Sequence, residues 1–324
     1  MNDKVSQNVM VLAEHTEAQV SEGTYELIGM ARELASELGG VTEVVLLGPA
    51  ELADQLGGAD LVVSVEHPAL LQYVPEAYER ALSEVLAQRS PRLLLMSNAT
   101  VGLDLAAALS VRWDAPLAAY VCRLGFDGAA VTATAQILGG KVFTEVELPG
   151  ERGIVTVLGG AFSAPDGLGN STPEIVHLTP PPQLDALRMS LLEVIGAAEG
   201  DLDITSAEML VSVGRGIDSQ ENLEIVQELA DALRVPLSGS RPVVDAGWLP
   251  KARQVGQSGV KVKPKAYIAL GISGAPEHLE GMRNAELIIA CNTDAGAPIF
   301  GVAHYGTTLD LFDLVPELIG KVRD

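Results

Sequence analysis

The sequence predicts an α/β protein with two doubly wound domains, each built on a mainly parallel sheet with helices on both faces. Short apolar strands alternate with helix-length segments in both halves of the chain, which is the pattern of parallel sheets. The 324 residues suffice for two domains of ordinary size. Hydrophobic residues make up 48% of the chain but aromatic residues only 4%, so the cores must consist of aliphatic side chains, as in buried parallel strands.

The first half of the chain shows the alternation clearly. Each predicted strand is a short aliphatic run, and Gly39 and Gly40 end the first predicted helix. The predicted strands are 9–13, 41–47, 61–65 and 93–96, and the predicted helices are 22–38, 71–88 and 103–111.

Residues 117–157 change the pattern, because two β-rich runs flank Gly139 and Gly140 and indicate a hairpin at an antiparallel edge of the sheet. The triple proline Pro180–Pro182 marks a stiff connection. We therefore expect the domain boundary between residues 180 and 207, with the domains at 1–195 and 196–324.

The second half resumes the alternation. A helix is expected to start at a cap on Asp218 or Ser219 and to reach residue 233, and another is expected over 276–282. Strands are expected over 209–213, 235–237, 267–270 and 287–290.

Polar side chains follow these four strands at the same geometric position. In doubly wound sheets, ligands bind beyond the carboxyl ends of the strands, so this recurrence predicts the rim of one crevice. Loops are polar in any case, and the Gly-Arg-Gly turn alone also fits a solvated arginine. The side chains in question are Arg215, Ser240, Arg241, Ser273, His278 and Asn292.

A positive segment lies in a chain whose formal net charge is -22. Between Arg241 and Lys265 there are six basic residues and one acid, Asp245. Glycines and hydroxyl residues flank part of it, and they let a backbone approach an anion closely. A phosphate-bearing ligand explains the segment, although a basic surface loop with ordinary turn glycines explains the same residues. Because loops as long as 243–264 are usually functional or disordered, we expect this one to be ordered over the ligand.

Composition excludes several classes of protein. The negative net charge argues against non-specific binding of nucleic acid or anionic membranes. Cys122 and Cys291 lie far apart and outside any CxxC pair, and the histidines lack metal-ligand spacing, so no metal site is expected. No secretory signal or membrane-spanning run is recognisable, so a soluble, cytoplasmic protein is expected.

The C-terminal 120 residues carry a specific signature. SRPVVDAGW, QVGQSG, YIALGISGAPEHLEGM, IIACNTDAGAPIF and HYGTTLDLFDLVPEL closely resemble the FAD-binding domain of the electron-transfer flavoprotein alpha subunit. The opening VMVLAEHTEA and the alternation after it are similar to that family's first domain, with weaker motifs.

The resemblance implies an electron carrier that transforms no substrate, and hence a protein without catalytic residues. It implies a heterodimer with an electron-transfer flavoprotein beta subunit, one FAD held mainly by the Rossmann-like second domain of this chain, and AMP or a second FAD in the beta subunit. Electrons would come from flavin dehydrogenases, such as the acyl-CoA dehydrogenases of fatty acid beta-oxidation. They would leave to a membrane quinone oxidoreductase.

The resemblance also implies which residues contact FAD. Arg241 matches the arginine against the isoalloxazine ring, His278 the histidine near its C2 carbonyl, and Ser258 a threonine near N5 and O4. The FAD-contacting positions are Arg215, Ser240, Arg241, Val255, Gly256, Gln257, Ser258, Ser273, Gly274, Ala275, Pro276, Glu277, His278, Asn292, Asp310 and Leu311.

Physical chemistry supports the role of the Arg241 charge. A guanidinium keeps its charge and is planar, so it favours the reduced, negatively charged flavin. If it stabilises that form by roughly 1.4 kcal/mol, the one-electron potential rises by about 59 mV. A contribution from His278 would depend on pH. Without the resemblance, Asp310 fits a helix N-terminal charge and Asn292 a turn residue equally well.

Besides Ser258, three positions depart from the family pattern: Thr293 replaces a lysine, Glu277 a glutamine and His304 an aspartate. These departures leave the flavin potential and the partner open.

One alternative to the simple carrier stays open, and the sequence argues against two others. A bifurcating complex oxidising NADH fits the same chain, since its distinguishing features lie in the beta subunit. A nucleotide-binding regulatory module would need a phosphate loop in residues 1–120, which is not found, and no GxGxxG supports an NAD-dependent dehydrogenase.

Overall fold

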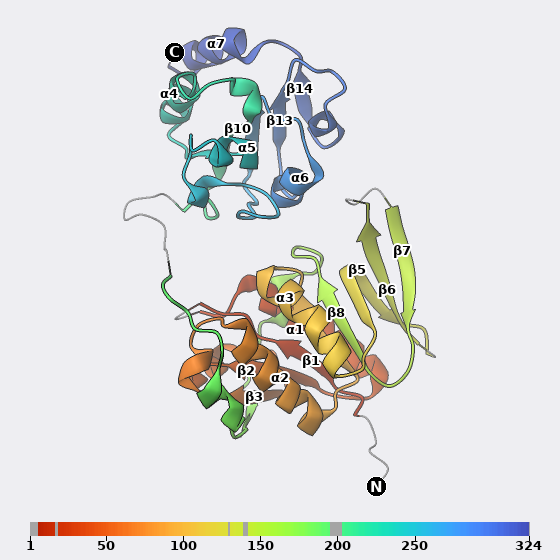
Figure 1. Cartoon of the computed structure of the whole chain (residues 1–324). Helices are drawn as coiled ribbons and strands as arrows, with labels where there is room; N and C mark the ends of the chain where they lie inside the picture. The colour runs from red at the N-terminus through yellow and green to blue at the C-terminus, as the bar shows by residue number, and fades with distance from the viewer. Residues whose placement is uncertain (1–5, 17–18, 129, 139–141, 195–202, 324) are drawn as a thin grey trace. The chain divides into compact units, whose positions relative to one another are not determined.

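The computed structural model describes residues 6–16, 19–128, 130–138, 142–194 and 203–323. The chain divides into two compact units, Met1–Val194 and Ile195–Asp324 (Figure 1). The expected boundary between residues 195 and 196 lies outside the described residues, as does the expected hairpin tip at Gly139 and Gly140.

The first unit is built on a nine-stranded sheet with the order β7-β6-β5-β8-β4-β1-β2-β3-β9. Every pairing is parallel except those of β6, which runs antiparallel to both of its neighbours. The mainly parallel α/β class and the antiparallel edge are thereby confirmed. The strands are β1 (Val9–Leu12), β2 (Thr42–Leu47), β3 (Leu61–Val65), β4 (Leu93–Ser97), β5 (Leu117–Phe126), β6 (Val131–Ile137), β7 (Val142–Leu148), β8 (Gly153–Val157) and β9 (Glu174–His177).

Helices cover both faces of this sheet, and alternate strand residues supply the two cores. Val9 and Val11 pack with α1 (Glu22–Leu38), whereas Met10 and Leu12 pack with α2 (Pro75–Arg89) and α3 (Thr100–Arg112). The expected bounds of α1 are confirmed. The expectation that α2 starts at residue 71 is wrong, because Pro68–Leu70 form a 3-10 turn and Pro75 occupies the first helical position.

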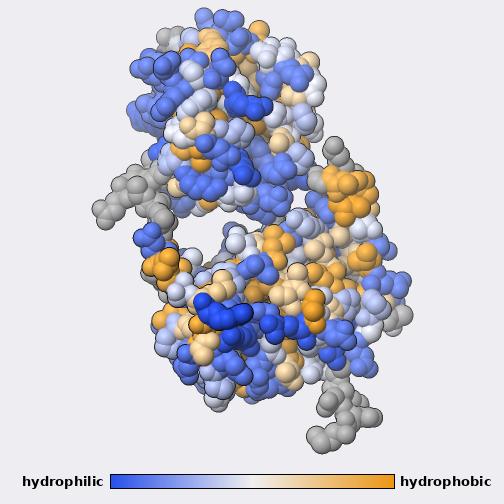
Figure 2. Space-filling view, viewed as in Figure 1, coloured by the Kyte–Doolittle hydropathy of each residue, from blue (hydrophilic) through white to orange (hydrophobic). Residues whose placement is uncertain are grey.

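The β5–β6–β7 segment carries apolar side chains on its surface. Leu138 is 73% exposed and Phe143 59% exposed, and Val142 and Val146 are also exposed. Figure 2 shows hydrophobic residues gathered on this part of the first unit. Strand β7 lies at the edge of the sheet. An edge strand with exposed apolar side chains is a ready surface for another chain.

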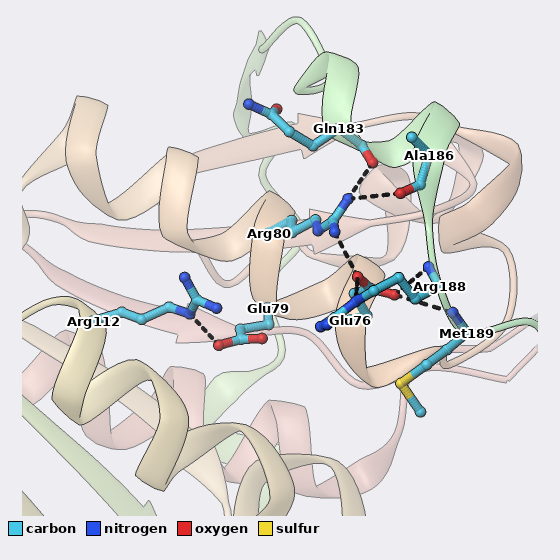
Figure 3. Close-up of polar contacts among 8 residues, drawn as sticks. All are labelled: Glu76, Glu79, Arg80, Arg112, Gln183, Ala186, Arg188 and Met189. Atoms are coloured by element: carbon cyan, nitrogen blue, oxygen red, sulfur yellow. Dashed lines mark hydrogen bonds and ion pairs between the residues drawn. The ribbon is translucent and has the colours of Figure 1, made fainter.

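A buried carboxylate fastens the end of the first unit to α2 (Figure 3). Glu76 is 6% exposed and accepts hydrogen bonds from the backbone N–H of Arg188 (2.7 Å) and of Met189 (3.1 Å). It also pairs with Arg80, which donates to carbonyls at both ends of the 183–186 turn. Burial alone would raise the pKa of Glu76, but the hydrogen bonds from Arg188 and Met189 and the Arg80 charge hold it below its ordinary value.

The second unit is a parallel five-stranded sheet with the order β11-β10-β12-β13-β14. The chain leaves β10 for β11 on one side and returns to β12 on the other, so the topological switch point lies between β10 and β12. The strands are β10 (Met209–Val213), β11 (Leu237–Gly239), β12 (Ala266–Leu270), β13 (Ile288–Cys291) and β14 (Tyr305–Thr307), and the helices are α4 (Leu223–Leu233), α5 (Arg241–Asp245), α6 (Pro276–Met282) and α7 (Leu311–Arg323).

The helices of the second unit also cover both faces of its sheet. Val211 and Val213 pack with α4 and α7, whereas Leu210 and Tyr267 pack with α6. The expected cap at Asp218 or Ser219 is wrong. Arg215–Ile217 form a 3-10 turn and Asp218 has φ 72°, so α4 begins only after Asn222. The short elements β14 and α5 were not expected from the pattern.

Candidate functional site

Two glycine turns meet at the switch point of the second sheet. Gly214 donates its N–H to Leu270 (2.8 Å) and Gly216 donates to Gly271 (3.1 Å). A Cβ on Gly214 would lie 2.3 Å from the Gly271 oxygen, and one on Gly216 would lie 2.8 Å from the Gly271 Cα. Only glycines allow this approach, which brings the exits of β10 and β12 together.

A cavity of about 740 Å³ opens at these strand exits. It collects thirteen of the sixteen positions predicted from the sequence, from all four predicted strand exits and from the 254–258 loop. The crevice expected at this edge of the sheet is therefore present. The predicted residues that line it are Arg215, Ser240, Arg241, Val255, Gly256, Gln257, Ser258, Ser273, Gly274, Ala275, Glu277, His278 and Asn292.

The three remaining predicted positions lie outside this lining. Asp310 and Leu311 line a smaller cavity of about 120 Å³, which shares Asn292 with the larger one. Asp310 also accepts the backbone N–H of Phe312 (3.0 Å), at the start of α7. Pro276 lines neither cavity and occupies the first position of α6, where its missing N–H is harmless.

Asn292 combines a turn role with its place in the lining. Its amide Nδ2 donates to the Ile272 carbonyl (2.9 Å), and its Oδ1 accepts the backbone N–H of Asp294 (2.9 Å). The interpretation as a turn residue is therefore correct, and the same turn positions the residue at both cavities.

Backbone hydrogen bonds hold the loop that begins at Gln254 against its neighbours. Val255 donates to Gly239 at the end of β11 (2.9 Å), and Gln257 donates to the Glu277 carbonyl (2.7 Å). Gly256 has φ 142°, and a Cβ there would lie 2.9 Å from the Glu277 oxygen. The wall of the cavity is therefore preformed where the loop meets α6.

His278 is the buried titratable group of the cavity wall. It is 6% exposed, and its Nε2 lies 3.0 Å from the hydroxyl of Tyr267, which is fully buried. Burial lowers the pKa of His278 to about 4, with a partial offset from the Val255 backbone. The imidazole is therefore neutral near pH 7, so it offers a neutral ring where the sequence suggested a pH-dependent charge.

The positive segment contributes one charge to the cavity lining. Arg241 lines the cavity, is 67% exposed and pairs with Asp245 one helical turn away (3.1 Å). Lys261 pairs with Glu280 and Lys265 with Glu208, outside the lining. These two lysines therefore pair with acidic side chains of the chain and do not contribute to the cavity lining.

Six lining residues were not predicted. Some adjoin predicted positions and were recognisable as strand exits or turn glycines. Asp245 carried no signal, because its place depends on helix α5. These six residues are Gly216, Pro242, Asp245, Gln254, Gly271 and Ile272.

The donor set of the cavity fits FAD. A volume of about 740 Å³ lies within the range of cofactor sites, roughly 300–1,000 Å³. Its polar wall offers two guanidinium groups, the hydroxyls of Ser240, Ser258 and Ser273, and a neutral imidazole. Glycines with positive φ at 256, 271 and 274 bring backbone close to the ligand space. Phosphate and carbonyl oxygens are the groups that such donors bind.

Comparison with known protein families shows to which family this chain belongs. The family model described as the electron transfer flavoprotein FAD-binding domain matches residues 203–283, and the electron transfer flavoprotein domain matches residues 9–183. The second of these covers more than half of the chain. This chain belongs to the electron-transfer flavoprotein family, as an alpha subunit.

Relatives of the electron-transfer flavoprotein alpha subunit match along nearly the whole chain. The electron transfer flavoprotein subunit alpha of Methylophilus methylotrophus is 35% identical and covers 96% of this chain and 97% of the relative. The acryloyl-CoA reductase electron transfer subunit beta of Anaerotignum propionicum is 33% identical, with 98% and 96% covered. The LctC subunit of the lactate dehydrogenase (NAD(+),ferredoxin) of Acetobacterium woodii is 33% identical, with 97% and 77% covered.

Across the described parts of this alpha subunit, no helix has both the length and the continuous apolar character that crossing a membrane requires.

Proposed function

We propose that this chain, paired with an electron-transfer flavoprotein beta subunit, holds one FAD in the larger cavity and shuttles electrons. The donors would be flavin dehydrogenases, such as acyl-CoA dehydrogenases, and the acceptor a membrane quinone oxidoreductase. The domains would be 1–195 and 196–324, the second binding FAD. The observation that carries the proposal is the meeting of thirteen predicted positions around one cavity at the switch point.

FAD, when bound, supplies a ring that takes up and gives back single electrons. The chain's own part is binding and electrostatics. Arg215 and Arg241 offer permanent positive charge, and the serine hydroxyls of the lining offer neutral donors. His278 stays neutral and is held by Tyr267, so it positions a ring nitrogen without adding charge near pH 7.

The surface of the first unit supports a partner chain. The exposed Phe143 and Leu138 lie at the edge of its sheet, where a beta subunit would cover them. The acryloyl-CoA reductase relative, described as an electron transfer subunit, supports a dehydrogenase partner of the acyl-CoA type.

A bifurcating complex that oxidises NADH is the second candidate. The observation favouring it is the resemblance to LctC, a subunit of a lactate dehydrogenase that uses NAD(+) and ferredoxin. The two candidates share the FAD site proposed in this chain and differ in what the beta subunit binds.

The first test is to co-express the chain with its beta subunit, count the flavins and follow the visible spectrum during stepwise reduction. One FAD per heterodimer, reduced in two one-electron steps, supports the simple carrier. Two flavins reducible by NADH support the bifurcating complex, and a heterodimer without flavin contradicts both.

Replacing Arg241 by alanine should lower the reduction potential of the bound flavin by up to about 59 mV, because a charge worth roughly 1.4 kcal/mol is lost beside the ring. Asp245→Asn should raise the potential, since it removes the carboxylate that pairs with Arg241. Spectroelectrochemical titration of both variants checks the two opposite signs. An unchanged potential in Arg241→Ala would show that Arg241 does not lie against the flavin ring.

A further inference from the structure

Three side chains beside the cavity form a continuous hydrogen-bonded chain. Lys251 donates its Nζ to Gln254 Oε1 (2.8 Å), and Gln254 Nε2 lies 2.9 Å from Ser258 Oγ. The same Nζ donates to the Ser258 carbonyl (2.8 Å). Gln254 is fully buried, and both Gln254 and Ser258 line the larger cavity.

The lysine decides which way round the glutamine amide lies. An ammonium group only donates hydrogen bonds, so the atom of Gln254 that faces Lys251 must be the oxygen. The NH₂ group then faces Ser258, and because an amide nitrogen does not accept, Ser258 Oγ must be the acceptor. The hydroxyl proton of Ser258 is therefore directed away from Gln254.

The backbone keeps this arrangement in place. Gln254 donates its N–H to the Lys251 carbonyl (3.0 Å) and accepts at its own carbonyl from Val260 (2.8 Å). A Cβ on Gly259 would lie 2.1 Å from the backbone carbonyl oxygen of Gln254, so the chain folds back tightly at this point. Ser258, one residue earlier, has little room to move away from the amide.

We propose that Lys251 and Gln254 are positioning residues that aim the Ser258 hydroxyl proton into the cavity, where it donates to the flavin ring. This inference rests on the proposed function, because it requires FAD in the larger cavity. Without the lysine the amide is able to turn over, present its oxygen to Ser258 and accept the hydroxyl proton, which withdraws the donor from the cavity. A donor aimed at the ring favours the reduced flavin, in which negative charge develops.

The test measures the potential of the bound flavin in the heterodimer. Lys251→Met, which keeps the aliphatic stem, should weaken the preference for the reduced form about tenfold, which equals about 59 mV for one electron. Ser258→Ala should give a shift of the same sign and similar size. The flavin carbonyl stretching bands in the infrared spectrum should move in both variants, because the ring loses the same donor. Lys251→Arg keeps a donor-only group and should retain most of the wild-type potential.

A double variant separates the effect of Lys251 on the Ser258 hydroxyl from the direct effect of the Lys251 charge on the flavin potential. If Lys251 acts through Ser258, Lys251→Met adds no further shift in the Ser258→Ala background. Lys261→Met, which removes an equal charge outside the cavity lining, serves as the matched control and should leave the potential near the wild-type value.

An additive shift in the double variant, or an unchanged potential in Lys251→Met, would overturn the proposal. The failure of the proposed function is recognised separately, because the wild-type heterodimer would then contain no flavin.

Discussion

Replacing Gly274 by alanine is expected to destabilise the second unit strongly and to weaken FAD binding at least tenfold. Gly274 has φ 83°, which costs an L-residue about 1–2 kcal/mol. A Cβ would also lie 2.3 Å from the backbone nitrogen of Ile299 and 2.6 Å from its Cα. Because both neighbours are backbone atoms, the turn itself must move, which adds about 1–3 kcal/mol.

FAD binding should fall because Gly274 and its neighbours Ser273 and Ala275 form one wall of the larger cavity. The backbone N–H of Ile299 also donates to the Ser273 carbonyl (3.0 Å), so displacing Ile299 moves the wall with it. Urea unfolding gives the stability, and fluorescence titration of the apoprotein gives the FAD affinity.

Gly247→Ala is the matched control for this prediction. Gly247 has nearly the same φ, 76°, yet a Cβ there would meet no atom of the described residues within 4 Å, and the residue lies outside the cavity lining. It should show the conformational cost alone and leave FAD binding unchanged. If both variants lose the same stability and the same affinity, the close approach to Ile299 is not what fixes the site.

Much of the site was predictable because parallel strands bring distant sequence positions to one edge. Arg215, Ser240 and Asn292 are spread over 78 positions, but each follows a strand and so each had to lie at the same end of the sheet. The aliphatic runs that form β3 and β10 were recognisable, because both faces of these strands are buried and little else has that composition.

What escaped prediction depends on contacts between segments. Tyr267 belongs to an apolar run, which predicts a core residue. Nothing in that run indicates that its hydroxyl forms a hydrogen bond with His278. Asp245 became a lining residue only because Arg241–Asp245 form a helical turn. The orientation of the Gln254 amide depends on its hydrogen bond from Lys251, and no sequence pattern distinguishes Lys251 from the other basic residues of the loop. Burial and partnership of this kind follow from tertiary structure, which local patterns do not encode.

The first unit holds a buried carboxylate that no sequence pattern singled out. Glu14 follows β1, next to the switch point between β1 and β4, and its Oε1 is buried without a hydrogen-bond partner among the described residues. Burial raises the pKa of Glu14 to about 7, although a hydrogen bond from the Gly102 backbone, in the first turn of α3, opposes the shift. Tyr73 and Tyr78 lie near it and add no positive charge to stabilise the ionised form.

Glu14→Gln is therefore expected to stabilise the protein at pH 8 by about 3 kcal/mol and to change little at pH 4.5. Because the folded-state pKa lies above the ordinary value of 4.5, the folded protein binds the proton more tightly than the unfolded chain does. The stability that protonated Glu14 contributes is fully present below pH 4.5 and is lost as the pH rises through about 7. Above that pH, the folded protein must keep an ionised carboxylate in its interior. Glutamine has the same shape, retains an oxygen for the Gly102 N–H and never ionises, so it removes this loss.

Urea unfolding of wild type and variant at pH 4.5, 6 and 8 measures the difference, and comparing the two chains at each pH cancels the other titrating groups. Glu22→Gln, at an exposed position in the first turn of α1, controls for the loss of one negative charge. A stability difference for Glu14→Gln that is the same at pH 4.5 and pH 8 would mean that folding does not shift the pKa of Glu14.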